Sequence, residues 1–263
     1  MPRLSQFCLV LAFLCSCMNG VPAAGAQELR IETEVFLGDS AKALAHTVTL
    51  FQSGTVYHFA DKPETVSVFR RPVGERPGRF ILLNPEAGKR TEVTTDKIDG
   101  LITKLNAWSE EQSDPLLQFA CNPEFEESFD KKTRVLTLKS ELWEYRVATI
   151  DAEGPTALAR YREFADWYSR LNTMLYSTLP PGPRLALNAA MEERGVLPVE
   201  IRRKVQSEAQ AVRAVHQLSW RLSRPDRTLL EEARQHLATF DKVDNQSYLA
   251  DLKQADVVRG QSE

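Results

Sequence analysis

The chain has 263 residues, a formal net charge of −3, 43% hydrophobic residues and 26% charged residues. A hydrophobic fraction of this size supports a packed core and excludes a disordered or low-complexity chain. The near balance of 33 basic and 36 acidic residues disfavours a protein that binds nucleic acid through its phosphates. We therefore expect no nucleic-acid partner.

Residues 1–26 have the pattern of an export signal. Arg3 supplies a positive charge, and an apolar run follows at residues 7–18. The run has the length of a signal-peptide core and is shorter than the roughly 20 apolar residues that a membrane-spanning helix needs. Ala24-Gly25-Ala26 matches a small-x-small cleavage site. We expect cleavage after Ala26 and a periplasmic or secreted protein that does not span the membrane.

An alternative interpretation uses residues 14–17 (LCSC), which resemble the lipoprotein pattern Leu-small-small-Cys. In that case a lipid on Cys17 would anchor the domain to an envelope membrane. Cys15 stands where the pattern normally has Ala or Ser, so export without a lipid anchor is favoured.

The cysteines do not predict a disulfide. Cys8, Cys15 and Cys17 lie within the signal, so Cys121 is the single cysteine of the mature chain. An intramolecular disulfide needs a second cysteine. We interpret Cys121 as a buried small residue.

The first part of the mature chain alternates apolar and polar residues with a period of two, which is typical of β-strands. We predict strands at residues 30–37, 44–51, 55–61, 65–70, 79–84 and 90–94. The strand at residues 79–84 is apolar on both faces. It is therefore expected in the middle of the sheet, covered by a helix on one side.

The later part of the chain mixes helical and strand periodicity. Helices are predicted at residues 95–108, 156–176, 184–193 and 225–240, and strands at residues 124–130, 134–140, 142–150, 199–205 and 216–222. The stretch 108–130 carries seven acids and no Lys or Arg, and we interpret it as a solvated loop and a strand edge. The polar residues after Asp244 are expected to be loosely held.

This element order predicts one α+β domain over residues 27–243, followed by a tail over residues 244–263. We expect a curved, half-barrel-like antiparallel sheet of about eight to ten strands, covered by inserted amphipathic helices. From Leu29 to about Leu222, the layout resembles the half-barrel of the periplasmic lipoprotein carriers and outer-membrane lipoprotein-sorting proteins. The resemblance implies a lipid or lipoprotein ligand and transfers no site residue. The chain equally resembles secreted bacterial proteins known only by sequence.

The stretch NPEAGKRT at residues 84–91 follows an apolar strand and contains Gly88-Lys89, as a nucleotide-binding phosphate loop does. Such a loop needs a glycine five residues before the Gly-Lys pair, and Leu83 occupies that position. The loop must also lead into a helix, whereas RTEVT is β-branched and predicts a strand. We therefore interpret the stretch as a hairpin connection.

No pattern of catalytic or metal-ligating residues stands out. His46, His58, His216 and His236 lack the close spacing of a zinc site. His46 and His58 could approach each other on neighbouring strands, although half-buried structural histidines are favoured. The chain has no Gly-x-Ser-x-Gly elbow. Carboxylates near Glu124 could pair as in a glycosidase, but such pairs are common by chance. We expect no metal, no cofactor and no enzymatic activity.

The aromatic residues on strands and on the long helix are the strongest functional signal. The candidate ligand-binding set is Tyr57, Phe59, Phe69, Trp143, Tyr145, Phe164, Trp167 and Tyr168. Shared packing between sheet and helix explains them more simply, because stripes at structural period are usually core. The functional alternative is that the inner face of the sheet stays partly open beneath the helix and holds an apolar ligand.

Three functions follow, in order of preference. The first is an exported, non-enzymatic binding or carrier protein that holds a lipid-like ligand or a lipoprotein segment. The second is a structural or assembly factor of the cell envelope that acts through protein contacts, which predicts an exposed apolar patch or sheet edge. The third is an exported hydrolase, whose first sign would be polar groups that converge in a deep pocket.

Overall fold

The computed structural model describes residues 28–260, and the side chains of residues 28–252. The expected signal peptide, the cleavage after Ala26 and the alternative lipid anchor at Cys17 lie outside the described residues.

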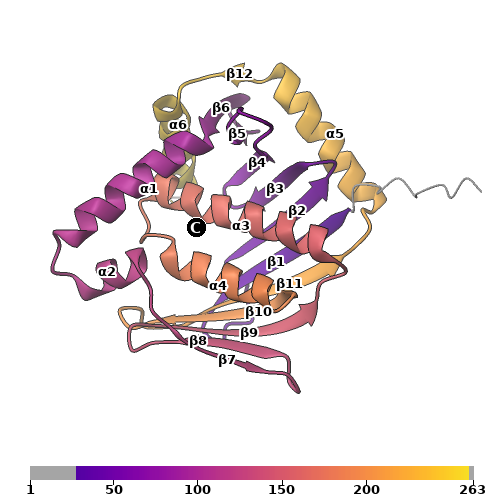
Figure 1. Cartoon of the computed structure of the whole chain (residues 1–263). Coiled ribbons are helices and arrows are strands. Elements are labelled where there is room, and N and C mark those ends of the chain that lie inside the picture. The colour runs from indigo at the N-terminus through magenta and orange to yellow at the C-terminus, as the bar shows by residue number, and fades with distance from the viewer. Residues whose placement is uncertain (1–27, 261–263) are drawn as a thin grey trace, which may run out of the picture.

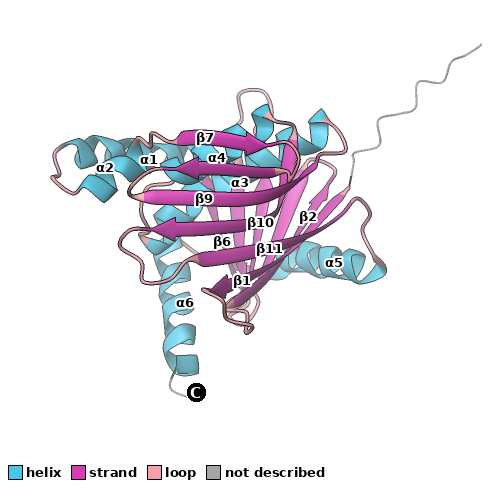
Figure 2. Ribbon diagram, turned by 90° about the horizontal axis from the view of Figure 1, so that it is seen from below, coloured by secondary structure: helices cyan, strands magenta, loops and turns pink. Residues whose placement is uncertain are grey.

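The described chain forms an α+β fold around one 12-stranded, mostly antiparallel sheet (Figures 1 and 2). The strands are β1 (Leu29–Leu37), β2 (Ala45–Gln52), β3 (Thr55–Asp61), β4 (Glu64–Arg70), β5 (Arg79–Asn84), β6 (Lys89–Thr94), β7 (Glu126–Asp130), β8 (Val135–Lys139), β9 (Trp143–Asp151), β10 (Val196–Val205), β11 (Val212–Ser219) and β12 (Asp241–Lys242). The order β12-β6-β5-β4-β3-β2-β1-β11-β10-β9-β8-β7 leaves β12 and β7 as edges. The expected eight to ten strands are too few, and β12 pairs with β6 in parallel.

Six helices accompany the sheet in the described part of the chain. They are α1 (Thr95–Glu110), α2 (Pro115–Cys121), α3 (Pro155–Tyr176), α4 (Gly182–Glu193), α5 (Arg224–Thr239) and α6 (Asn245–Gly260). Figure 1 shows α3 and α4 side by side across one face of the sheet, with α1 and α2 at its margin and α5 beyond the strands β2 to β4. None of the described helices is long and apolar enough to cross a membrane.

The sheet has a hydrophobic core on each face. The core under α3 and α4 includes Phe51, Phe69, Phe80 and Phe164, and it also takes in Val147 of β9, seven strands from β5 in the sheet. The second core lies under α5. Its buried members are Val48, Leu50, Tyr57, Val66, Val68, Ile81, Leu83, Leu222, Leu230 and Ala233. Helices therefore cover both faces of the strands β2 to β5.

Strand β5 is an interior strand, as predicted, but it is third from the β12 edge rather than in the middle of the sheet, and helices cover both of its faces instead of one. Phe80 and Leu82 belong to the α3 core, and Ile81 and Leu83 belong to the α5 core. The stretch after it is a hairpin between β5 and β6. The Asn84 side chain accepts a hydrogen bond from the Ala87 backbone N–H at 3.1 Å. Gly88 has a φ of +63°, which a glycine adopts without steric cost.

Two helices were missed in the sequence prediction. The acidic stretch contains α2, where Asp114 accepts hydrogen bonds from the backbone N–H groups of Leu116 and Leu117, with Pro115 at the first helical position. Cys121 ends this helix and is half-buried rather than buried. The segment after Asp244 is also not a loosely held tail at its start, since it forms α6, where Tyr248 and Leu252 are only 2% and 7% exposed.

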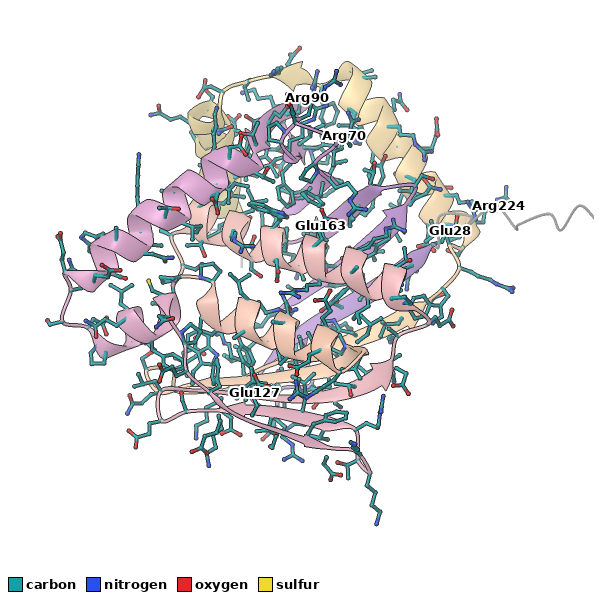
Figure 3. All side chains as sticks on the ribbon, in the orientation of Figure 1. Glu28, Arg70, Arg90, Glu127, Glu163 and Arg224 are labelled. Carbon is teal, nitrogen blue, oxygen red and sulfur yellow. The ribbon has the colours of Figure 1, made fainter. Side chains whose placement is uncertain are left out.

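Helix α5 is tied to the first strand. Its start carries a capping box in which Ser223 and Asp226 each bind the other's backbone N–H. Buried Asp226 also accepts a hydrogen bond from Arg30 at 3.0 Å. Glu28, labelled in Figure 3, accepts from the guanidinium of Arg227 at 3.1 Å and from the Leu222 backbone N–H at 3.3 Å. The start of β1 and the cover of the second face are thereby connected.

Candidate functional site

The sheet divides the eight candidate aromatic residues between its two faces. Phe69, Trp143, Tyr145, Phe164, Trp167 and Tyr168 lie in or against the core under α3 and α4. Tyr57 belongs to the core under α5, and Phe59 packs against it. Successive side chains of a strand point to opposite faces, so the β3 residues that face α3 are Val56, His58 and Ala60. The structure does not bring Tyr57 and Phe59 together with the other six.

The six that share a face form separate groups. Phe164 of α3 lies 6.2 Å from Phe69 and 5.3 Å from Tyr168, measured between ring centroids. Trp143 and Tyr145 pair at 6.0 Å on β9, beneath α4. Trp167 lies under the Arg170 guanidinium, at 5.0 Å from the ring centroid to Cζ. Most of the set is therefore core packing.

Phe164 fills the space under the middle of α3. It is 6% exposed and also contacts the Phe51 ring edge-on, with 5.8 Å between centroids. Aromatic rings at these separations pack as a core does. Tyr161, one turn earlier in α3, is buried as well. The inner face is closed along this part of the helix.

A cavity of about 280 Å³ lies beyond Phe164, under the second half of α3. Its floor comes from the strands β2, β3 and β4 and consists of Ala45, Thr47, His58, Ala60, Thr65 and Ser67. Its roof comes from α3 and consists of Tyr168, Asn172, Leu175 and Tyr176. His46, Asp61, Lys62 and Pro63 complete the lining around the β3–β4 turn. Of the candidate aromatic set, Tyr168 is the member that lines it.

His58 is a buried polar group of the floor, at 8% exposed. Its Nδ1 and the Thr49 hydroxyl are hydrogen-bonded at 2.9 Å. The imidazole ring lies 4.5 Å from the Tyr168 ring, between centroids. Burial lowers the pKa of His58 from 6.5 to about 4, because a charged imidazolium would lose its hydration there. The side chain is neutral near pH 7.

Two neighbouring rows of paired residues explain why this floor is polar. Thr49, His58 and Ser67 pair across the strands β2, β3 and β4. Thr47, Ala60 and Thr65 form the next row. All six residues point toward α3, since they are an even number of residues from Phe51, Val56 or Phe69 in the α3 core. The rows beyond Phe164 thus carry hydroxyl groups, an imidazole and small side chains instead of large apolar ones.

The two histidines of β2 and β3 do not meet. His58 pairs in register with Thr49, and the backbone N–H of His46 donates to the Asp61 carboxylate at 3.1 Å. By strand alternation the His46 side chain lies on the α5 side, where its Nε2 and a Glu32 carboxylate oxygen are 2.7 Å apart. His216 is on the α3 side and its Nδ1 is hydrogen-bonded to Thr33 at 2.8 Å. Among the described residues, no group of three or more His, Cys, Asp or Glu side chains could hold a metal ion.

A larger hollow of about 520 Å³ lies at the edge of the sheet near β7 and β8. It is lined by Glu124, Phe125, Glu126, Lys139, Ser140 and Glu141. The three glutamates are exposed, so the hollow is a shallow, solvated surface. It lacks the enclosed apolar walls of a ligand site. The cavity under α3 is therefore the better candidate.

Sequence reasoning found Tyr168 and missed most of the cavity. The sequence pattern does not point to Ser67, Thr65 or Asn172, and it favours a structural role for His58. The available signal was a polar residue at an interior position in each of three adjacent strands, Thr49, His58 and Ser67. Polar side chains that are buried without charge partners are uncommon in a sheet core.

Comparisons with known proteins add no assignment. The sequence matches no protein-family model and is significantly similar to none of the curated proteins.

Proposed function

We propose that the protein is an exported, non-enzymatic binding protein that holds a ligand between the inner face of its sheet and helix α3. In this proposal the sheet acts as a half-barrel and α3 as its cover, as in the periplasmic lipoprotein carriers that the element order resembles. The ligand is an apolar or amphipathic molecule, such as a lipid or the acylated end of a lipoprotein.

The observation that carries the proposal is the change in packing along α3. Phe164 closes the inner face in the middle of the helix, whereas beyond Tyr168 the same helix covers a cavity of about 280 Å³. Ligand sites usually enclose roughly 300–1,000 Å³, so the cavity suits a small molecule or one end of a longer one. A domain that needed only a core would gain stability by filling this space.

Polar side-chain contacts of α3 are consistent with this difference between the packed part of the helix and the part that covers the cavity. Glu163 forms a salt bridge with Arg71 at 2.9 Å, and Asp166 accepts a hydrogen bond from Asn188 of α4 at 2.8 Å. Glu163, labelled on α3 in Figure 3, comes before the α3 residues that line the cavity. These contacts hold α3 up to Asp166, ahead of the residues that form the roof of the cavity.

Native mass spectrometry of protein purified from an envelope extract tests the proposal. We expect the wild-type protein to carry an additional mass. The Ala60→Trp variant places a large ring on the cavity floor and should carry none. The same substitution at exposed Gln217 of β11 is the matched control and should retain the additional mass. A folded wild-type protein without any bound molecule, or equal loading of Ala60→Trp, would contradict the proposal.

A second candidate, an envelope assembly factor, is favoured by one surface feature. Leu101 and Trp108 of α1 are 39% and 50% exposed, and their spacing of two turns puts them on one side of the helix. The sheet edges argue less for this function. β7 carries Glu126, Glu127 and Asp130, and charged edges resist pairing with another strand. Cross-linking from position 101 in whole cells tests it, and failure to recover any partner would count against it.

A further inference from the structure

The imidazole of His58 has one nitrogen with a protein partner and one without. Nδ1 is engaged with Thr49 at 2.9 Å. Among the described residues, no hydrogen bond reaches Nε2. The fully buried, unpartnered side-chain nitrogens include His216 Nε2 and His236 Nδ1 but not His58 Nε2. His58 Nε2 thus keeps accessible surface, and the cavity that His58 lines supplies it.

The neighbours of His58 fix the direction of its free nitrogen. The Tyr168 ring lies 4.5 Å from the imidazole and the Phe164 ring 6.0 Å, between centroids. A side chain held by one hydrogen bond and two rings has little rotamer freedom left to lose when a ligand binds. The free nitrogen is therefore a preorganised recognition group.

Ser67 is the second unused polar group of the floor. It pairs with His58 across β3 and β4, is 8% exposed, and lines the same cavity. Its hydroxyl has no hydrogen-bond partner among the described residues. The Ser67 oxygen is not among the fully buried, unpartnered side-chain atoms, so like His58 Nε2 it keeps accessible surface in the cavity. An oxygen atom of a ligand can therefore form hydrogen bonds with both groups, each of which contributes modestly to affinity.

The interior of the cavity carries no formal charge. Its charged lining residues, Asp61 and Lys62, have opposite signs and are exposed at the β3–β4 turn. His46 lies beside Asp61 at the same turn, where its ring faces the Glu32 and Asp61 carboxylates. The other lining residues have no formal charge, and His58 is uncharged near pH 7 because burial lowers its pKa to about 4. An ion that enters loses its hydration and finds no opposite charge inside, which is unfavourable.

We infer that the cavity selects an uncharged amphipathic molecule, with a hydroxyl or carbonyl oxygen bonded to His58 Nε2 and the Ser67 hydroxyl, and a short alkyl part against Ala45, Ala60 and Leu175. The inference rests on the proposed binding function and adds the chemical class of the ligand. It also distinguishes this site from a purely apolar slot, since the polar floor would stay unpaired under a plain hydrocarbon.

Calorimetric titration with four probes of equal chain length tests the inference near neutral pH. Octanol carries a hydroxyl head, methyl octanoate a carbonyl, octanoate a negative charge and octylammonium a positive charge. We expect octanol or methyl octanoate to bind at least about tenfold more tightly than either ion. The better of the two neutral probes identifies the head group as an alcohol or an ester.

Two variants test the assigned contacts. Ser67→Ala removes the hydroxyl with almost no change in volume and should weaken binding of the neutral probe about five- to tenfold. His58→Phe removes both nitrogens and should weaken it at least as much. Ser128→Ala on the exposed edge strand β7 makes the same chemical change away from the cavity and should have no effect. If His58→Phe does not fold, the comparison of Ser67→Ala with Ser128→Ala still tests the assigned contacts.

The outcomes separate the inference from the proposed function. If an ion binds as tightly as the neutral probes, or if Ser67→Ala binds the neutral probe as the wild type does, the inference is overturned and a binding function stands. If no probe binds and the purified protein carries a charged ligand, the inference is again overturned alone. If no probe binds and no ligand copurifies, both are overturned.

Discussion

The rings of His58 and Tyr168 lie 4.5 Å apart between centroids, one from strand β3 and the other from helix α3. This contact joins the polar floor of the cavity to its roof. It also marks where α3 changes from closing a core to covering a space, because Phe164 lies one turn earlier in the helix and is buried among Phe51, Phe69 and Phe80.

The buried imidazole makes stability depend on pH. Above about pH 6.5 His58 is neutral in both states. Between pH 6.5 and about 4 only the unfolded chain binds the proton, because burial lowers the pKa of His58 to about 4 in the folded protein. The free energy of unfolding therefore falls as the pH drops through this range, by about 2 kcal/mol between pH 7.5 and pH 5.

Urea denaturation of the wild-type protein and of His58→Gln at these two pH values measures this contribution. His216, whose pKa burial lowers to about 3, acts in the same direction and leaves a slope in both proteins. The difference between the two slopes isolates His58. Equal slopes for the two proteins would mean that His58 does not titrate as a buried neutral group.

Phe164 and Tyr57 test the separation of the two faces. Each is 6% exposed, Phe164 in the core under α3 and Tyr57 in the core under α5. Truncation of either to Ala should lower the free energy of unfolding by about 3–5 kcal/mol. Only Phe164→Ala should change the affinity for octanol, because it extends the cavity. A change in affinity with Tyr57→Ala of the same size would show that the faces are not separate.

Gly182 at the start of α4 is a site where a side chain has no room. A Cβ there would lie 2.4 Å from the backbone oxygen of Ala120 in α2, and backbone cannot move aside without strain. Gly182→Ala should therefore destabilise the protein by about 1–3 kcal/mol.

Gly100 is the matched control, since it lies exposed in α1 and, apart from its chain neighbours and the backbone of its own helix, no atom lies within 4 Å of its Cβ position. Gly100→Ala should stabilise by about 0.5–1 kcal/mol. Thermal unfolding of both variants measures the contrast. If Gly182→Ala were as stable as Gly100→Ala, the close contact between α2 and α4 would be wrong.

Truncation of Leu252 tests whether α6 is packed against the rest of the domain. The helix is tied to β6 by the Thr91 hydroxyl, which donates to Asn245 at 2.6 Å, and by the salt bridge of Lys89 with Asp251 at 2.9 Å. Leu252 is 7% exposed, so Leu252→Ala should cost about 2–3 kcal/mol. Leu44→Ala, at a leucine that is 55% exposed, should cost less than about 0.5 kcal/mol. Equal losses would contradict a packed α6.

The sequence was most informative where a single periodicity ran through an element. The alternation in β1 and the helical spacing in α3 predicted both elements to within a residue or two. For β3 the orientation of the strand was harder to predict than its position. Val56 and His58 lie on one face and Tyr57 and Phe59 on the other, so both faces carry large apolar residues. Alternation still separates such residues into two sets, but it does not say which set meets α3. That required the position of α5, which is fixed by contacts with residues far away in the chain, such as Asp226 with Arg30.

The two helices that the sequence did not predict, α2 and α6, each begin at a capping Asp, but each lies in a stretch of polar composition. Asp114-Pro115 is a good helix start, and Asp244 binds the backbone N–H of Ser247 in the same way. Both lie in polar stretches, whose composition predicts a solvated loop for the first and a loosely held tail for the second. The cavity was less accessible to prediction, since it depends on the register of three strands and on the place where Phe164 ends the packed part of α3.

The most direct test of the central claim is to locate a bound ligand by NMR. With octanol bound, we expect intermolecular nuclear Overhauser effects to the ring protons of His58 and Tyr168, and none to those of Tyr57 on the opposite face. Contacts to Tyr57, or saturable binding without any contact to His58 or Tyr168, would contradict a ligand site between the sheet and α3.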